Sequence, residues 1–158
     1  PLHSTSHPCP VAFFMPAPKP APAHHCSIYI DGSSLPNPGP MSLGVVLHMP
    51  DGTQHTLSKA LHQVGCNNEA ELLALMAALN LARELNATCL TICTDSSVLL
   101  EQLGPPRPKP ARPIARLSYL FDEARQQMQG FDELVLQWVP RHRNTEADAL
   151  ARAAHTTA

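Results

Sequence analysis

The chain has 158 residues, 44% of them hydrophobic, and a formal net charge of −2. This length suits one buried core, and no apolar run approaches the roughly 20 residues of a membrane-spanning helix, so we expect a protein outside the membrane. The slight negative charge argues against a nucleic-acid partner unless some of the acidic residues hold metal ions. Five cysteines form no C-x-x-C pair, which favours reduced thiols in a cytoplasmic protein.

Residues 1–25 are rich in proline and show no usable periodicity. They predict a flexible N-terminal extension, in part similar to polyproline II. The segment lacks the basic start of a signal peptide, and prolines interrupt its apolar stretch, so we expect no such signal. A single domain is predicted over residues 26–155.

Alternating apolar residues predict strands over 26–31, 41–49 and 53–60, with a hairpin turn between the last two. An amphipathic helix over 68–85, a β-branched strand over 88–94 and a short helix over 96–103 follow. Five prolines in 104–113 stop that helix, and a helix over 114–129, a strand over 133–139 and a helix over 144–154 complete the domain. The order βββαβααβα predicts an α/β fold, with a mixed five-stranded sheet flanked by helices.

Four acidic residues stand where strands are predicted to end or helices to begin: Asp31, Glu71, Asp95 and Asp148. Helix capping can explain three of them singly: Asp95 as an N-cap, Glu71 in a capping box begun by Asn68, and Asp148 in another. Asp31 has no such explanation, since its strand is otherwise typical of a buried one. If these element edges meet in space, four carboxylates converge, and such an all-oxygen set favours Mg²⁺ or Mn²⁺ over zinc, often as two ions about 4 Å apart.

The strings around these acids are IYIDGSSLPNPGP (28–40), CNNEAELLAL (66–75), LTICTDSS (90–97) and WVPRHRNTEADALARAA (138–154). In this order they resemble type 1 ribonuclease H, and the resemblance spans residues 26–154. It implies the ribonuclease H-like fold, which agrees with the element order above. It also implies an endonuclease that hydrolyses the RNA strand of RNA–DNA hybrids with two Mg²⁺ ions, or Mn²⁺ as a substitute, leaving 3′-hydroxyl and 5′-phosphate ends.

The resemblance assigns the metal ligands and catalytic acids to Asp31, Glu71, Asp95 and Asp148. Glu71 is chosen over Glu69 because it follows Asn-Asn-x-Ala, and side chains two apart on a helix point about 200° apart. His142 stands where the family keeps a histidine for product release or proton transfer, yet only five residues separate it from Asp148. A phosphate-contacting or solvated role for His142 therefore stays open. The implied substrate contacts, to the minor groove and to RNA 2′-hydroxyls, are Gly32, Ser34, Asn37, Asn67, Asn68 and Asn144.

Two segments depart from the family pattern. Residues 62–66 lack the Arg and Thr with which many relatives grip a DNA phosphate, and 104–113 is too short for a basic protrusion. Four cations follow the helix predicted over 96–103. They are either a reduced substitute for that protrusion or part of a solvated linker: Arg107, Lys109, Arg112 and Arg116.

We expect a monomer. The alternative function is a catalytically weak or inactive module that binds hybrids or double-stranded RNA. Related exonucleases usually open with Asp-x-Glu, which this chain lacks.

Overall fold

The computed structural model describes residues 25–156. Its elements are β1 (His25–Ser34), β2 (Gly39–His48), β3 (Gln54–Gly65), α1 (Asn67–Glu84), β4 (Cys89–Thr94), α2 (Ser97–Leu103), the 3₁₀ helix η1 (Ala115–Leu117), α3 (Ser118–Met128), β5 (Glu133–Trp138), the 3₁₀ helix η2 (Arg141–Arg143) and α4 (Thr145–Thr156). The sheet order is β3-β2-β1-β4-β5. Pairs β1–β2 and β2–β3 are antiparallel, whereas β1–β4 and β4–β5 are parallel, which confirms the mixed five-stranded sheet. Within 25–156, no helix has the length and apolar character needed to cross a bilayer.

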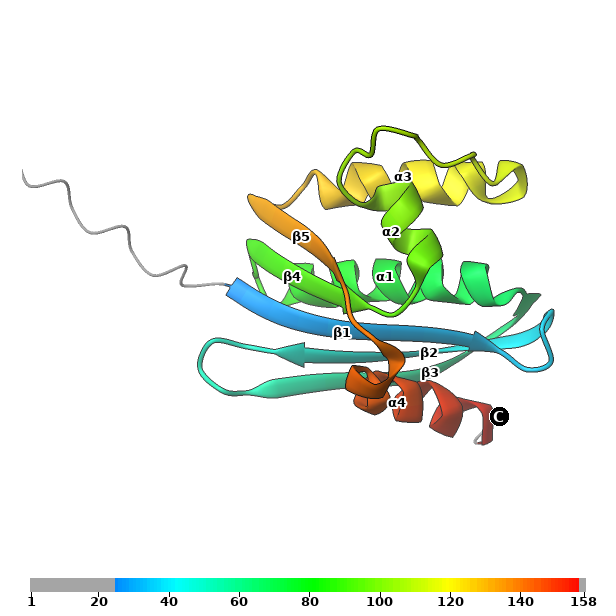
Figure 1. Ribbon diagram of the computed structural model, residues 1–158. Coiled ribbons are helices and arrows are strands. Elements are labelled where there is room, and N and C mark those ends of the chain that lie inside the picture. Colours follow the sequence, from blue (N-terminus) through cyan, green and yellow to red (C-terminus); the bar gives the residue numbers. More distant parts are fainter. Residues whose placement is uncertain (1–24, 157–158) are drawn as a thin grey trace, which may run out of the picture.

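The main core lies between one face of the sheet and helices α1, α2 and α3, while α4 covers the other face over β1, β2 and β3 (Figure 1). On β1, Cys26, Ile28 and Ile30 are fully buried and alternate with partly exposed residues, as a strand with one face on the core requires. Leu72, Leu75 and Leu79 give α1 its matching apolar face at helical spacing.

Helix α4 approaches β2 unusually closely because both surfaces carry small residues. A Cβ atom added to Gly44 would lie 2.1 Å from the carbonyl oxygen of Ala147, so only glycine allows this approach. The hydroxyl of Ser42 donates a 2.6 Å hydrogen bond to the carbonyl oxygen of Ala151, and both residues are fully buried. Contacts at Gly44 and Ser42 therefore hold α4 close to β2.

Strand β1 continues beyond the predicted end at Asp31, so the placement of this acid at a strand terminus is wrong. The ladder with β2 runs on to the pair Ser34↔Met41, and Asp31 faces Gly44. The sequence Gly-Ser-Ser has no apolar alternation, and only its pairing with β2 keeps it extended. On the other side, however, the ladder with β4 ends at Tyr29↔Cys93. Asp31 thus lies in mid-strand at the point where its β4 neighbour has already ended.

Other boundaries shift by a few residues. β1 begins at His25, inside the predicted extension, of which residues 1–24 lie outside the described part of the chain. The helix expected over 114–129 starts as the 3₁₀ turn η1 and becomes α-helical only at Ser118. The predicted order of strands and α-helices is otherwise confirmed.

Candidate functional site

Three of the four acids meet at one point. Asp31, Glu71 and Asp95 each place a carboxylate oxygen within 4.8 Å of the other two. Asp31 lies just past the end of the β1–β4 ladder, and Asp95 directly follows β4, so the parallel pairing brings both to the same edge. Glu71 comes from α1 on the core side of the sheet, where its Oε2 atom accepts a 3.2 Å hydrogen bond from the Gly32 amide.

The start of α1 differs from the predicted capping box. The N-cap is Cys66, whose Sγ accepts from the Glu69 amide at 3.5 Å, so the assignment of Asn68 as N-cap is wrong. Asn68 lies within the first turn, and the acid of that turn is Glu69. Glu71 falls in the next turn, so helix capping no longer explains it. A thiol at this position gave no capping signal, because Ser, Thr, Asp and Asn are the usual N-caps.

Capping does not explain Asp95 either. Ser96 is the N-cap of α2, and its hydroxyl oxygen accepts a 3.2 Å hydrogen bond from the Leu99 amide. The Asp95 carboxylate instead accepts a 3.2 Å bond from the side-chain amide of Asn144. The side chain of Asp95 is therefore turned toward the acid cluster and the start of α4.

Asp148 joins the cluster through Asp31. It lies in the first turn of α4, outside the three-acid group, and its Oδ2 atom forms a 2.9 Å ion pair with Arg152 one turn later. Its carboxylate is close enough to that of Asp31 to raise the pKa of Asp31 by a shared hydrogen bond and by charge. Asp31 is thus the acid on which the other three converge. The ion pair with Arg152 was not predicted, although the i,i+4 spacing was visible in the sequence.

Burial and repulsion by neighbouring carboxylates disfavour ionisation of Asp31 and Glu71. Burial, followed by the charge of Asp95 and then by Asp148, raises the pKa of Asp31 to about 7. Burial, followed by the charges of Asp31 and Asp95, raises the pKa of Glu71 to about 10. Within residues 25–156, no Lys or Arg forms a salt bridge with either residue or with Asp95. An all-oxygen donor set without a cation of its own suits Mg²⁺ or Mn²⁺, so the residues fit a divalent metal site.

A polar network lies beside Glu71 at the turn between β1 and β2. The oxygen of the Asn67 side chain accepts from the Ser34 amide at 2.9 Å and from its hydroxyl at 3.3 Å. The oxygen of the Asn37 side chain accepts from the backbone amide of Asn67 at 3.1 Å. Since both oxygens are engaged, the exposed Asn37 and Asn67 present their NH₂ groups as the remaining donors. Ser34 itself is buried, and its hydroxyl also lies 3.2 Å from the side-chain oxygen of Asn37, so it contacts both side-chain amides.

The remaining predicted site residues are placed differently. His142 lies on the exposed η2 turn, and within residues 25–156 no hydrogen bond or ion pair joins it to the acids. Asn144 is 1% exposed and contacts Asp95 rather than the surface. Gly32 is buried, and its backbone faces α1.

Cys66 has a neighbour that sequence reasoning did not find. The guanidinium of Arg116, on η1, donates to its Sγ at 2.9 Å. Burial opposes ionisation of the thiol, but the Glu69 amide and the Arg116 guanidinium outweigh it, so the pKa of Cys66 is lowered overall. The contact joins positions 50 apart in sequence, which is why no local pattern indicated it.

Gly32 allows β1 to touch α1, and this contact leads to a stability prediction. A Cβ atom here would lie 2.2 Å from the carbonyl group of Ala70 and 2.4 Å from the Glu71 nitrogen. Because backbone cannot move aside as a flexible side chain would, we expect Gly32→Ala to destabilise the protein by about 3 kcal/mol or more, measured by urea unfolding. Gly130→Ala is the matched control, since its nearest contact would be 3.3 Å, and it should change stability by less than about 1 kcal/mol. Equal stability of the two variants would contradict the proposed contact.

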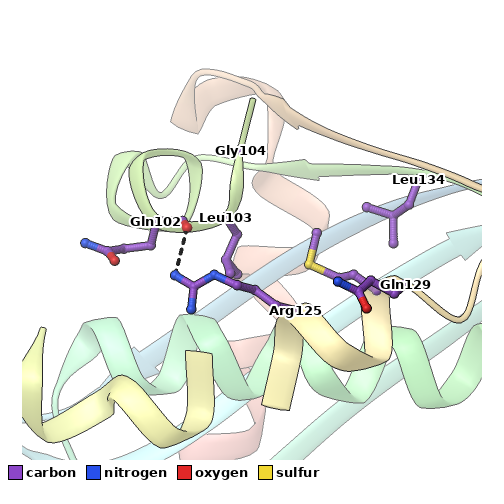
Figure 2. Close-up of a pocket in the computed structure, with 7 residues that line it drawn as sticks. Gln102, Leu103, Gly104, Arg125, Gln129 and Leu134 are labelled. Carbon is purple, nitrogen blue, oxygen red and sulfur yellow. Dashed lines mark hydrogen bonds between the residues drawn. The ribbon is translucent and has the colours of Figure 1, made fainter. Parts of the chain in front are cut away.

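A separate pocket of about 400 Å³ lies between the C-terminal ends of α2 and α3 and the start of β5 (Figure 2). It is lined by Gln102, Leu103, Gly104, Arg125, Met128, Gln129 and Leu134. Arg125 donates a 3.1 Å hydrogen bond to the Gln102 carbonyl oxygen across it. None of its lining residues is a candidate from the sequence, so the pocket is distinct from the acid cluster.

Known proteins are similar to this chain in sequence and in fold. Residues 30–154 match a family described as reverse transcriptase-like. A bifunctional protein of Mycobacterium tuberculosis is 36% identical over 129 residues, covering 80% of this chain and 34% of that relative. The chain therefore spans about a third of the length of this relative.

Solved structures agree with the sequence match. RNase H1 from the archaeon Halobacterium salinarum superimposes with a TM-score of 0.75 at 32% identity, covering 85% of this chain and 99% of that one. LC11-RNase H1, isolated from compost and solved in complex with an RNA/DNA hybrid, gives a TM-score of 0.70 at 26% identity, covering 84% and 97%. With the four ordered strings around the acids, these matches show that the chain belongs to the type 1 ribonuclease H family.

Proposed function

We propose that the chain is a metal-dependent endonuclease that hydrolyses the RNA strand of RNA–DNA hybrids and leaves 3′-hydroxyl and 5′-phosphate ends. The observation that carries this proposal is the convergence of Asp31, Glu71 and Asp95, buried or half-buried and without a cation of their own among the described residues. The family supports it, and a relative has been solved with such a hybrid.

The four acids are proposed to hold two Mg²⁺ ions, with Mn²⁺ as a substitute. Bound there, the ions would supply activation of the attacking water and stabilisation of the leaving oxygen. The protein contributes the arrangement of the acids: Asp31 at the centre, Glu71 held by the Gly32 amide, and Asp95 held by Asn144. Asp148, carried by α4, adds the fourth carboxylate.

The neighbouring amides support discrimination of RNA from DNA. Asn37 and Asn67 are exposed, and their fixed side-chain oxygens leave NH₂ donors for acceptors on the substrate. Ribose 2′-hydroxyls and minor-groove base edges are such acceptors, and the 2′-hydroxyl is the group that DNA lacks.

Exposed cations on the connection between α2 and α3 are proposed to contact the backbone phosphates. Arg107, Lys109 and Arg112 lie on that connection, and Arg116 reaches the start of α1 beside Asn67. Contacts to phosphate weaken steeply with added salt, so hybrid affinity should fall as ionic strength rises.

Cleavage of end-labelled substrates tests the proposal. Wild-type protein with Mg²⁺ should cut the RNA strand of a hybrid, spare duplex DNA of the same sequence, and stop cutting in EDTA. Asp95→Asn, which keeps the shape of the side chain but removes its charge, should bind the hybrid without cutting it. Binding without cleavage by the wild type would favour the inactive hybrid-binding module, and activity retained by Asp95→Asn would contradict the assignment of the site.

A further inference from the structure

Asn144 contacts the segments that carry three of the four acids. Its side-chain nitrogen donates to the carbonyl oxygen of Ile30, next to Asp31, at 2.8 Å, and to Asp95 Oδ2 at 3.2 Å. The backbone carbonyl oxygen of Asn144 accepts from the backbone amide of Asp148 at 3.1 Å. One residue at the start of α4 therefore joins β1, the end of β4 and the helix that bears Asp148.

The side chain of Asn144 has a single defined orientation. The two hydrogens of its NH₂ group match its two acceptors, whereas a flipped amide would place its oxygen against two other oxygens. The amide oxygen is buried and has no partner among the described residues. A buried oxygen without a hydrogen bond costs free energy. The two bonds that the side-chain nitrogen donates must therefore offset this cost and hold the side chain in place.

Burial distinguishes Asn144 from the other amides that the family resemblance assigned to substrate contact. Asn144 is 1% exposed, whereas Asn37 and Asn67 lie at the surface. The partners of Asn144 are instead a candidate metal ligand and the backbone beside another. Residues that hydrogen-bond to metal ligands, without binding the metal themselves, orient those ligands and tune the affinity of the site for the metal.

We infer that Asn144 is a positioning residue that fixes Asp95 relative to Asp31 and Asp148, and so sets the affinity of the acid cluster for divalent metal ions. This inference rests on the proposed function only in that the acids bind a metal. Without the donor at Asn144, Asp95 loses its described hydrogen bond, and β1 loses a tie to α4 that spans 114 positions.

Metal binding by the full chain, without substrate, tests the inference. Mn²⁺ affinity is measured by electron paramagnetic resonance or calorimetry for wild type, Asn144→Ala and Asn144→Ser. Loss of a residue that orients metal ligands typically weakens metal binding by about 10–100-fold, and we expect this for Asn144→Ala. Serine supplies one hydroxyl donor for two acceptors, so Asn144→Ser should also bind Mn²⁺ more weakly and provides a test if the alanine variant is too unstable.

Ser42→Ala is the matched control, because Ser42 is also buried and also joins α4 to the sheet, but through Ala151 and away from the acids. It should lower thermal stability while leaving Mn²⁺ affinity unchanged. Wild-type affinity in the Asn144 variants would overturn the inference, as would an equal loss of affinity in Ser42→Ala, which would reflect loosened docking of α4. A wild-type protein that binds Mn²⁺ but leaves hybrids intact would overturn the proposed function alone, whereas no Mn²⁺ binding would overturn both.

Discussion

Glu71→Gln is expected to lower Mg²⁺-dependent cleavage of the hybrid by at least about 10³-fold, because it removes one ligand charge from a site whose chemistry depends on bound cations. Glutamine keeps the length of the side chain and an oxygen that can accept from the Gly32 amide, which glutamate does at 3.2 Å. The fold should therefore survive. The measurement is the single-turnover rate on a labelled hybrid at saturating Mg²⁺.

Glu69→Gln is the matched control for this experiment. Glu69 lies two positions earlier on the same helix, in its first turn, and outside the three-acid group. Its substitution removes the same charge from the same helix, so the cleavage rate should stay within a few-fold of wild type. A loss at Glu69 equal to that at Glu71 would mean that the helix start, rather than the metal cluster, carries the effect.

Without metal ions, the protein should become less stable as pH rises from 5 to 8. Burial first, then neighbouring carboxylates, raise the pKa of Asp31 to about 7 and that of Glu71 to about 10. The ordinary values, 3.8 and 4.5, apply to the unfolded chain. Each proton is thus held more tightly by the folded state, so its stabilising effect is complete below pH 4 and is lost as pH rises through the folded pKa.

The window follows from these values. Asp31 contributes a decline between about pH 4 and 7, and Glu71 extends it above pH 8. Since one pKa unit corresponds to about 1.4 kcal/mol, the free energy of unfolding should fall by roughly 2 kcal/mol or more between pH 5 and 8. Urea unfolding in EDTA measures it, and saturating Mg²⁺ should remove much of the decline by binding only the folded state.

Asp31→Asn should flatten this pH dependence and make the metal-free protein more stable than wild type at pH 8. The gain would show that the acid cluster costs stability when no cation is bound. Asp122→Asn is the control, because Asp122 is an exposed acid on α3 whose partner Arg125 is also at the surface. Its pH dependence should match wild type. A slope that Asp31→Asn leaves unchanged would contradict the raised pKa of Asp31.

The fold could be predicted from the sequence because its signals are local. Apolar residues alternate along β1 and recur at helical spacing along α1, and five prolines mark the break after α2. The true end of β1 could not be predicted, since Gly-Ser-Ser stays extended only through pairing with β2. The N-cap of α1 was missed because a thiol, Cys66, replaces the usual oxygen.

The site was partly predictable for the same reason. The identity of the acids came from ordered strings, and their meeting point followed from parallel pairing of β1 with β4. The contacts around them join remote positions, such as Asn144 to Ile30 and Arg116 to Cys66, and depend on how closely helices dock. The near-complete burial of Asn144, which is 1% exposed, has no counterpart in a local pattern.

The close contact of α4 with β2 has a consequence for the order of folding. α4 is the last described helix, and it brings Asp148 and Asn144 to strands that precede it by about a hundred positions. Such long-range contacts form late, because the chain loses the most entropy in closing them. Before α4 docks, Asp31, Glu71 and Asp95 would lack the hydrogen bonds that Asn144 donates to Asp95 and to the backbone beside Asp31. Recovery of the proposed activity during refolding should therefore lag behind recovery of sheet structure and report on the final docking step.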